Sequence, residues 1–471
     1  MAPVHEDPIK ISLAWRVFAY PRGVRLAFPA VMFGLVLAIL AVPFAAEAQD
    51  AGRPKHDPFQ GMERSGRIPK IPLPDDLPNP ERWRYLPEGR IMPGNIFQRF
   101  LVSTFIAPQF FFEQDIGAGG GIAFTDIDFR SQRRREFLGA FLSYTTEGQQ
   151  KYRAIWRRWL HHQDLPTGGV IVEERSRVDA FGGYEKSLTR RFFGFGPDTR
   201  ARDETSYVDE LIDLGARADF ALPKAGGDWV ATIGARGEFH NLAPGRVSGR
   251  PTTDDAFPEV FSAGDGYQSG IFTAGLRYDT RDSQHQPYRG FQVGALLDAP
   301  LLQSTGDTGL VATVFGNVAF PLPPLFHGGG DDREENPPTD TLALGATVQA
   351  SAGDMPFYLR PSLGGSHTLR GYIANRFTDN SSWHAAAEYR FWVIPRGFAI
   401  TDTIRIERVG MVLFYEAGTV AESLEELPAS RVHTSYGVGL RFSLERTAVF
   451  RADVGFSKED INVTVGFGLS F

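Results

Sequence analysis

Apolar and polar residues alternate with a period of two along most of the chain, from about Leu101 to the last residue. The clearest case is 461–471, where every odd-numbered position is apolar and every even-numbered position is Asn, Thr, Gly or Ser. Successive side chains of a β-strand point to opposite faces, so this segment predicts a strand with one apolar and one polar face. Similar alternation, with Arg or Asp on the polar side, recurs in 272–279, 436–442 and 448–454.

This pattern predicts sixteen strands. Their approximate spans are 103–112, 117–128, 136–147, 150–162, 168–182, 205–221, 227–241, 268–281, 289–301, 306–321, 340–353, 382–394, 406–418, 432–446, 447–457 and 460–471. A soluble sandwich would bury the apolar faces, whereas a membrane barrel would turn them toward lipid and enclose the polar faces. A predicted export signal, an aromatic last residue and the charges on the polar faces favour the barrel. We therefore predict an all-β membrane protein, a 16-stranded antiparallel transmembrane β-barrel.

The segment before the strands has two parts. Arg22 and Arg25 precede an apolar stretch that ends in Ala-Glu-Ala at 46–48, which predicts a secretory signal peptide over 1–48. The alternative is a retained membrane anchor, although two prolines in or near the stretch weaken it. Residues 49–96 are rich in Pro and show no period, and we expect an extended periplasmic linker ahead of a barrel over 97–471.

Composition narrows the classes of function. Mean hydropathy is −0.21, too low for a bundle of membrane helices. The chain has no Cys, which excludes disulfides and thiolate chemistry, and its net charge of −7 argues against a nucleic-acid partner. His161 and His162 are adjacent on a predicted strand, so they point to opposite faces and cannot chelate one metal together. We predict no catalytic residue, no metal and no cofactor, and hence no enzyme.

Several motifs follow one another in the second half of the chain. Residues 369–372 read Leu-Arg-Gly-Tyr, 388–390 read Glu-Tyr-Arg, 414–418 read FYEAG, 437–442 read GVGLRF, and the last residue is Phe. In this order they resemble the C-terminal barrel of the BamA/TamA-type outer-membrane superfamily, also called bacterial surface antigens. The resemblance runs from about Phe97 to Phe471. FFGFGPDTR at 192–200 is similar to a motif of the shorter members of that family.

The resemblance implies a lumen-inserted extracellular loop, which the connection 354–381 matches. Leu369, Arg370, Gly371 and Tyr372 would form its lumen-loop motif, with Arg370 against an acidic residue at the position of Glu416, where the family usually has Asp. Periodicity independently places Glu388, Arg390 and Glu416 on the polar side of their strands, and Arg441 likewise. Phe467, Leu469 and Phe471 would form the C-terminal strand signal. The plainer alternative is that Arg370 lies in a solvent loop and that Glu416 is one of many lumen charges.

Members of this family assemble or translocate polypeptides, and the resemblance implies such a role at the outer membrane, with membrane lipids, client polypeptides or periplasmic proteins as partners. BamA- and TamA-type proteins carry periplasmic POTRA domains before the barrel, whereas only the linker at 49–96 precedes it here. That difference places direct insertase activity in doubt. A passive porin-like pore and a structural surface antigen are the alternatives.

Overall fold

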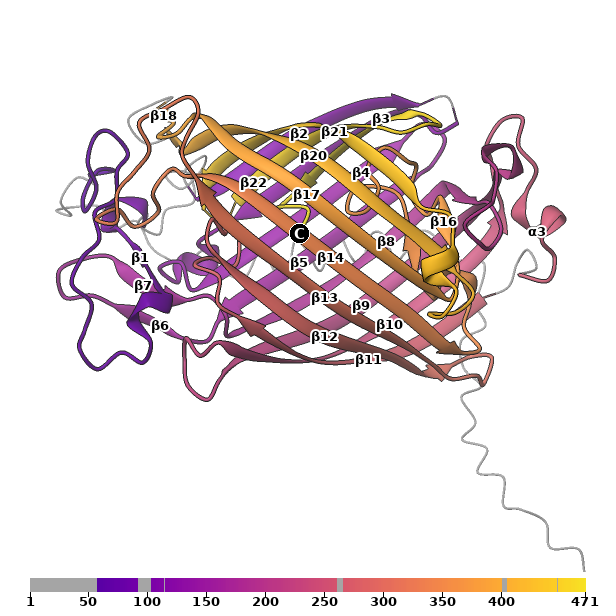
Figure 1. Ribbon diagram of the computed structural model, residues 1–471, viewed down its shortest axis with the longest axis horizontal. Coiled ribbons are helices and arrows are strands. Elements are labelled where there is room, and N and C mark those ends of the chain that lie inside the picture. The colour runs from indigo at the N-terminus through magenta and orange to yellow at the C-terminus, as the bar shows by residue number, and fades with distance from the viewer. Residues whose placement is uncertain (1–56, 92–102, 114, 261–265, 400–404, 447) are drawn as a thin grey trace, which may run out of the picture. The chain divides into compact units, whose positions relative to one another are not determined.

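One large antiparallel sheet dominates the protein, which is described by a computed structural model (Figure 1). The structure describes residues 57–91, 103–113, 115–260, 266–399, 405–446 and 448–471. The predicted signal peptide lies outside these ranges. Within these ranges the sheet has sixteen strands, which confirms the predicted number. In order across the sheet they are β2 (Thr104–Glu113), β3 (Gly117–Asp126), β4 (Glu136–Thr145), β5 (Gln150–Trp159), β8 (Arg177–Phe192), β9 (Thr205–Leu222), β10 (Trp229–Pro244), β11 (Gly266–Asp279), β12 (Gly290–Gln303), β13 (Gly309–Leu322), β14 (Asp340–Gly353), β17 (Ser381–Ile394), β20 (Arg408–Ala421), β21 (His433–Glu445), β22 (Ala448–Phe456) and β23 (Ile461–Phe467).

The two faces of the sheet differ as the alternation predicts. In β20, Leu413 and Tyr415 are exposed, while Phe414 and Glu416 between them are buried on the opposite face. The register carries this division across neighbouring strands, because Glu416 lies opposite Ser435 and Tyr415 opposite Tyr436. Exposed apolar side chains also line β11, β12, β21 and β23; they include Phe272, Leu276, Leu297, Val438, Leu440, Val463 and Val465. One face is therefore apolar and exposed, and the other, here called the polar face, carries the charges.

Each strand pairs with its sequence neighbours in the sheet, so successive connections alternate between two ends. The long connections after β8, β10 and β14 share one end with the turn between β22 and β23, and we call this the loop end. The opposite end is the turn end. At the loop end the connection 354–380, here called the motif loop, contains β15 (Ser362–Leu363) and β16 (Phe377–Thr378), which pair with each other.

A second, three-stranded sheet lies at the turn end. It consists of β1 (Trp83–Leu86), β7 (Val170–Glu173) and β6 (His162–Asp164), in that order. The predicted strand 168–182 is thus divided, because its first part pairs with β1 and only Arg177 onward joins the large sheet. Residues 57–91, which belong to the predicted linker, make specific contacts: β1 pairs with β7, and Lys70 N–H donates to the Arg333 carbonyl at 2.8 Å. Leu86 packs there with Trp159, Val170 and Val172.

The remaining elements are short. They are the 3-10 turns η1 (Pro80–Arg82), η2 (Glu88–Arg90), η3 (Phe129–Ser131), η4 (Ala201–Asp203), η5 (Phe357–Leu359) and η6 (Leu427–Ala429), the helix α3 (Thr253–Ala256), and the paired strands β18 (Phe398–Ala399) and β19 (Arg405–Ile406). Among the described residues, no helix has the length and apolar character needed to cross a membrane.

The last strand ends earlier than predicted. β23 stops at Phe467, and Gly468 adopts a φ of +77°, a left-handed conformation that favours glycine. The chain then turns back across the polar face, where the Ser470 hydroxyl donates to Glu388 Oε1. Phe471 lies against β14 and β17, with its ring centroid 5.1 Å from the Arg390 guanidinium. Leu469 and Phe471 therefore do not continue the strand pattern.

Candidate functional site

The motif loop turns sharply at the predicted motif. Leu369 has a φ of +43°, which is unfavourable for a side chain branched beyond Cβ, and Tyr372 N–H closes a turn to the Leu369 carbonyl at 2.8 Å. Leu369 is nevertheless fully buried, in a cluster with Leu363, Tyr372, Phe377 and Val420. Burial of these apolar side chains offsets the local backbone strain. The turn directs the next side chain, Arg370, toward the sheet.

Arg370 is fully buried against three carboxylates from three strands. Its Nε lies 2.9 Å from Glu416 Oε1 on β20, its Nη2 lies 2.7 Å from Glu388 Oε1 on β17, and its Nη1 lies 3.3 Å from Asp453 Oδ2 on β22. The backbone N–H of Arg370 also donates to Glu416 Oε2 at 2.6 Å. The guanidinium carbon lies 3.6 Å from the centre of the Phe414 ring, within range for a cation–π contact.

The charge of Arg370 is stable in this position. Burial alone would lower its pKa, but the surrounding carboxylates of Glu388, Glu416 and Asp453 outweigh burial and raise the pKa above its ordinary value. The guanidinium is planar and has five donors, so it can serve three acceptors at once, which a lysine ammonium of the same charge would do less well.

Glycines allow the backbone of the motif to approach the sheet. A Cβ added to Gly371 would lie 2.5 Å from the carbonyl carbon of Phe456, and one added to Gly455 would lie 2.5 Å from that of Arg370. Both distances are far below van der Waals contact, and both neighbours are backbone atoms. The motif is thus packed directly against β22, and side chains at these two positions would push them apart.

Further arginines surround the same carboxylates. Arg390 Nε donates to Glu388 at 2.7 Å, and Asp453 accepts from Arg441 and from Arg451, the latter at 3.2 Å. Ser435 donates to Glu416 at 2.8 Å. Arg441 and Arg451 are opposite one another in the register of β21 and β22. Asp453 accepts hydrogen bonds from both, so its negative charge offsets the repulsion between the two arginines. The result is a buried network in which each carboxylate has at least one arginine partner.

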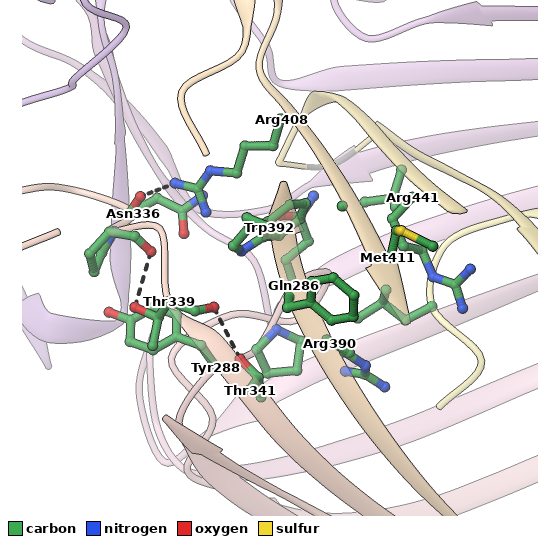
Figure 2. Close-up of a pocket in the computed structure, with 16 residues that line it drawn as sticks. Gln286, Tyr288, Asn336, Thr339, Thr341, Arg390, Trp392, Arg408, Met411 and Arg441 are labelled. Atoms are coloured by element: carbon green, nitrogen blue, oxygen red, sulfur yellow. Dashed lines mark hydrogen bonds between the residues drawn. The ribbon is translucent and has the colours of Figure 1, made fainter. Parts of the chain in front are cut away.

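A cavity of about 40 Å³ borders this network at the turn end of the sheet. Its walls include Arg390, Arg441, Asn336, Trp392 and Leu469. In Figure 2 the guanidinium groups of Arg390 and Arg441 lie on the opposite side of the cavity from Asn336, which accepts a hydrogen bond from Arg408. This volume holds only a few water molecules, so the cavity is too small for a sizeable ligand.

The structure brings several predicted residues together and adds others. Arg370, Glu388, Arg390, Glu416 and Arg441 belong to one buried network, whereas the side chain of Phe467 lies outside what is described. Asp453 was missed, although Arg451-Ala-Asp453 shows the same polar spacing as the other strands. Across the described ranges, no group of three His, Asp or Glu side chains is arranged to hold a metal ion.

Three solved structures are similar in part. BamA from Haemophilus ducreyi lacking POTRA domains 1–3 is 13% identical, with a TM-score of 0.43, 78% of this chain covered and 70% of that one. CdiB from Acinetobacter baumannii is 11% identical (TM-score 0.41; 78% and 58% covered), and CdiB from Escherichia coli is 10% identical (TM-score 0.47; 77% and 61% covered). This chain therefore spans less than two thirds of either CdiB chain.

The comparison with curated proteins gave no match. At the level of families, the Omp85 superfamily domain matches residues 213–471, which is more than half of the chain and includes the motif loop and all three carboxylates around Arg370. The chain belongs to the Omp85 superfamily.

Proposed function

We propose that this chain is an outer-membrane β-barrel that helps to insert or secrete polypeptides. The family supports a role of this kind at the outer membrane. The exposed apolar face of the sheet suits contact with lipid, and closing β2 against β23 would leave no unpaired strand edge in the hydrocarbon region. The polar face would then surround a lumen, and the motif loop, which contacts that face, would lie inside it.

The observation that carries the proposal is the position of Arg370. A long connection that leaves the strands at the loop end returns across the polar face and places this arginine on carboxylates of β17, β20 and β22. In an assembly barrel, such a brace would keep the wall intact while one seam loosens.

The proposed mechanism is physical and uses no catalytic residue. A poorly paired seam between the first and last strands would offer backbone N–H and C=O groups to an incoming strand, by the same hydrogen bonds that build a sheet. The Arg370 network would hold the strands beside the seam meanwhile. Client polypeptides would be the main partners, and a separate periplasmic protein would deliver them. We further propose export by a signal peptide over 1–48 that is cleaved.

Quantitative proteomics of purified outer membranes tests this function. Cells that lack the gene are compared with cells that carry the wild-type chain, Arg370→Ala or Arg370→Lys. Selective loss of particular barrels or secreted proteins in the deletion, restored by the wild-type chain and not by Arg370→Ala, would support the proposal and would identify the clients. An unchanged proteome in the deletion would contradict it.

A passive pore is the second candidate, and one observation favours it. Arginines and carboxylates line the polar face of β5 and β8–β12, among them Arg153 with Asp213 at 2.7 Å and Arg236 with Asp298 at 3.1 Å, and several of these side chains are partly exposed. Such a wall could set ion preference. Conductance of the purified protein in a planar bilayer, without any client, would favour this candidate.

A further inference from the structure

The hairpin formed by β22 and β23, here called the terminal hairpin, is short. β22 has nine residues and β23 has seven, whereas the strands from β8 to β14 have fourteen to eighteen. Among the described residues, β23 pairs only with β22, over seven register positions. Because β23 has one paired neighbour in the described sheet, contacts other than strand pairing help to decide how firmly it is held.

Arg376 supplies such a contact at the turn of the terminal hairpin. Its Nε and Nη2 donate to the two carboxylate oxygens of Glu459 at 2.7 and 3.0 Å, a bidentate pair. The same guanidinium donates to the hydroxyl and the carbonyl of Thr199 at 2.9 and 2.8 Å. Its guanidinium carbon also lies 4.4 Å from the centroid of the Phe193 ring and 4.4 Å from that of the Phe377 ring.

Arg376 thereby joins three segments that are far apart in sequence. It belongs to the motif loop, Thr199 lies in the β8–β9 connection, and Glu459 lies in the hairpin turn. The side chain of Arg376 is 1% exposed. Bidentate, charge-assisted hydrogen bonds of a buried arginine are among the stronger polar contacts in proteins, so this pair fixes the hairpin turn to the other loops.

A second contact lies on β23 itself. The side-chain amide of Asn462 donates to the carbonyls of Arg370 and Tyr372, at 3.0 and 3.1 Å. These two carbonyls flank Gly371, whose backbone is packed against β22. The motif loop therefore contacts the turn, the outer strand and the inner strand of the terminal hairpin, through Glu459, Asn462 and Asp453 respectively.

We propose that the motif loop is a clamp for the terminal hairpin, with the Arg376–Glu459 pair as its latch. Releasing the latch would loosen β23, which Asn462 still ties to the motif loop, while the Arg370 network continues to hold β17, β20 and β22. This inference goes beyond the proposed function, because it concerns how the last strand is held whether the barrel assembles, secretes or conducts.

Hydrogen–deuterium exchange of the purified protein in phospholipid nanodiscs tests the clamp without any client. Glu459→Gln removes the charge of the latch and keeps its shape, and Glu425→Gln, at an exposed position, is a matched control. We expect amide exchange in 448–467 to accelerate roughly tenfold in Glu459→Gln and to stay as in the wild type in the control, with β9–β13 unchanged in both. Asn462→Ala should accelerate exchange in the same peptides.

Two outcomes would overturn the clamp. One is wild-type exchange in 448–467 for both Glu459→Gln and Asn462→Ala. The other is an equal acceleration in every strand, which would show lower stability of the whole sheet and no local release. Arg376→Lys provides a further check, because lysine keeps the charge but cannot form the bidentate pair and reach Thr199 together, so its exchange should lie between wild type and Arg376→Ala.

Discussion

Arg370 and Glu416 are joined twice, because the guanidinium Nε lies 2.9 Å from one carboxylate oxygen and the backbone N–H of Arg370 lies 2.6 Å from the other. The carboxylate therefore fixes both the side chain and the main chain of the motif. Only a residue with two acceptor atoms, in a strand facing the loop, can do this. The pair thus fixes the motif loop to β20, in addition to neutralising two charges.

Arg370→Ala should destabilise the protein strongly. It leaves Glu388, Glu416 and Asp453 buried with fewer cationic partners, and removal of one member of a buried ion pair typically costs about 3–5 kcal/mol. We expect lost heat-modifiable mobility on gels and protease cleavage within 354–380. Arg370→Lys should be intermediate. Unchanged mobility together with an uncleaved loop in Arg370→Ala would show that the arginine does not brace the sheet.

Gly371→Ala should weaken the contact between the motif and β22. The new methyl group would lie 2.5 Å from a backbone carbon of Phe456, and overpacking of this kind costs about 1–3 kcal/mol. The folded fraction after refolding into detergent can be measured by gel mobility. Gly328→Ala is the control, because a Cβ there meets no atom within 4 Å. Equal folded fractions for the two variants would argue against close packing at Gly371.

Leu86→Ala should loosen the small sheet at the turn end. Leu86 is buried among Trp159, Val170 and Val172, and truncation of a buried leucine costs about 2–5 kcal/mol. We expect proteolytic cleavage within or directly after the segment 57–91 to accelerate, while the large sheet remains resistant. The exposed Leu424→Ala, in the connection after β20, serves as control. Resistance equal to that of the control would mean that the segment is held by other contacts.

The small sheet should also weaken as the pH falls. Burial lowers the pKa of His162 below its ordinary value of 6.5, although its hydrogen bond to the Arg133 carbonyl and the charge of Asp164 act in the opposite direction. The unfolded segment then binds more protons than the folded one below pH 6.5, so stability is lost as the pH falls through that value. Amide exchange in 83–91 should accelerate between about pH 7.5 and about pH 5.5, after correction for the intrinsic rate.

His162→Gln provides the comparison for that measurement. Glutamine can donate to the same carbonyl but does not titrate, so the pH dependence assigned to His162 should disappear. An identical pH dependence in the wild type and the variant would assign the effect to other groups.

The alternation in the sequence predicted the sixteen strands because each strand is exposed on one face, and a period of two is visible within a single strand. The alternation also placed Glu388 and Glu416 on the polar face, opposite the apolar residues beside them. It could not show that Asp453 reaches Arg370, because that contact depends on the register of β20, β21 and β22. Register is set by pairing between strands and leaves no mark on one strand alone.

Residues 57–91 make contacts that no pattern in their own sequence indicates. β1 has only four residues, too few to display a period, and its partner β7 lies more than eighty residues later. Arg376 was missed for a similar reason, since nothing near it in sequence indicates that Glu459 and Thr199 will meet it. β23 ends early because Gly468 turns the chain and the residues after it bond to Glu388 and Arg390 on β17. The alternation within the last strand does not indicate these contacts with β17.

The contacts of residues 57–91 also join the first described part of the chain to two distant turns. The segment is synthesised before every strand of the large sheet, yet Lys70 bonds to Arg333, Ile68 to Glu335, and Arg82 to Asp228. None of these partners is in position until the turns of β9–β10 and β13–β14 have formed. Complete docking of the earliest described part of the chain thus requires both of these turns, so this segment links two separate hairpins of the large sheet.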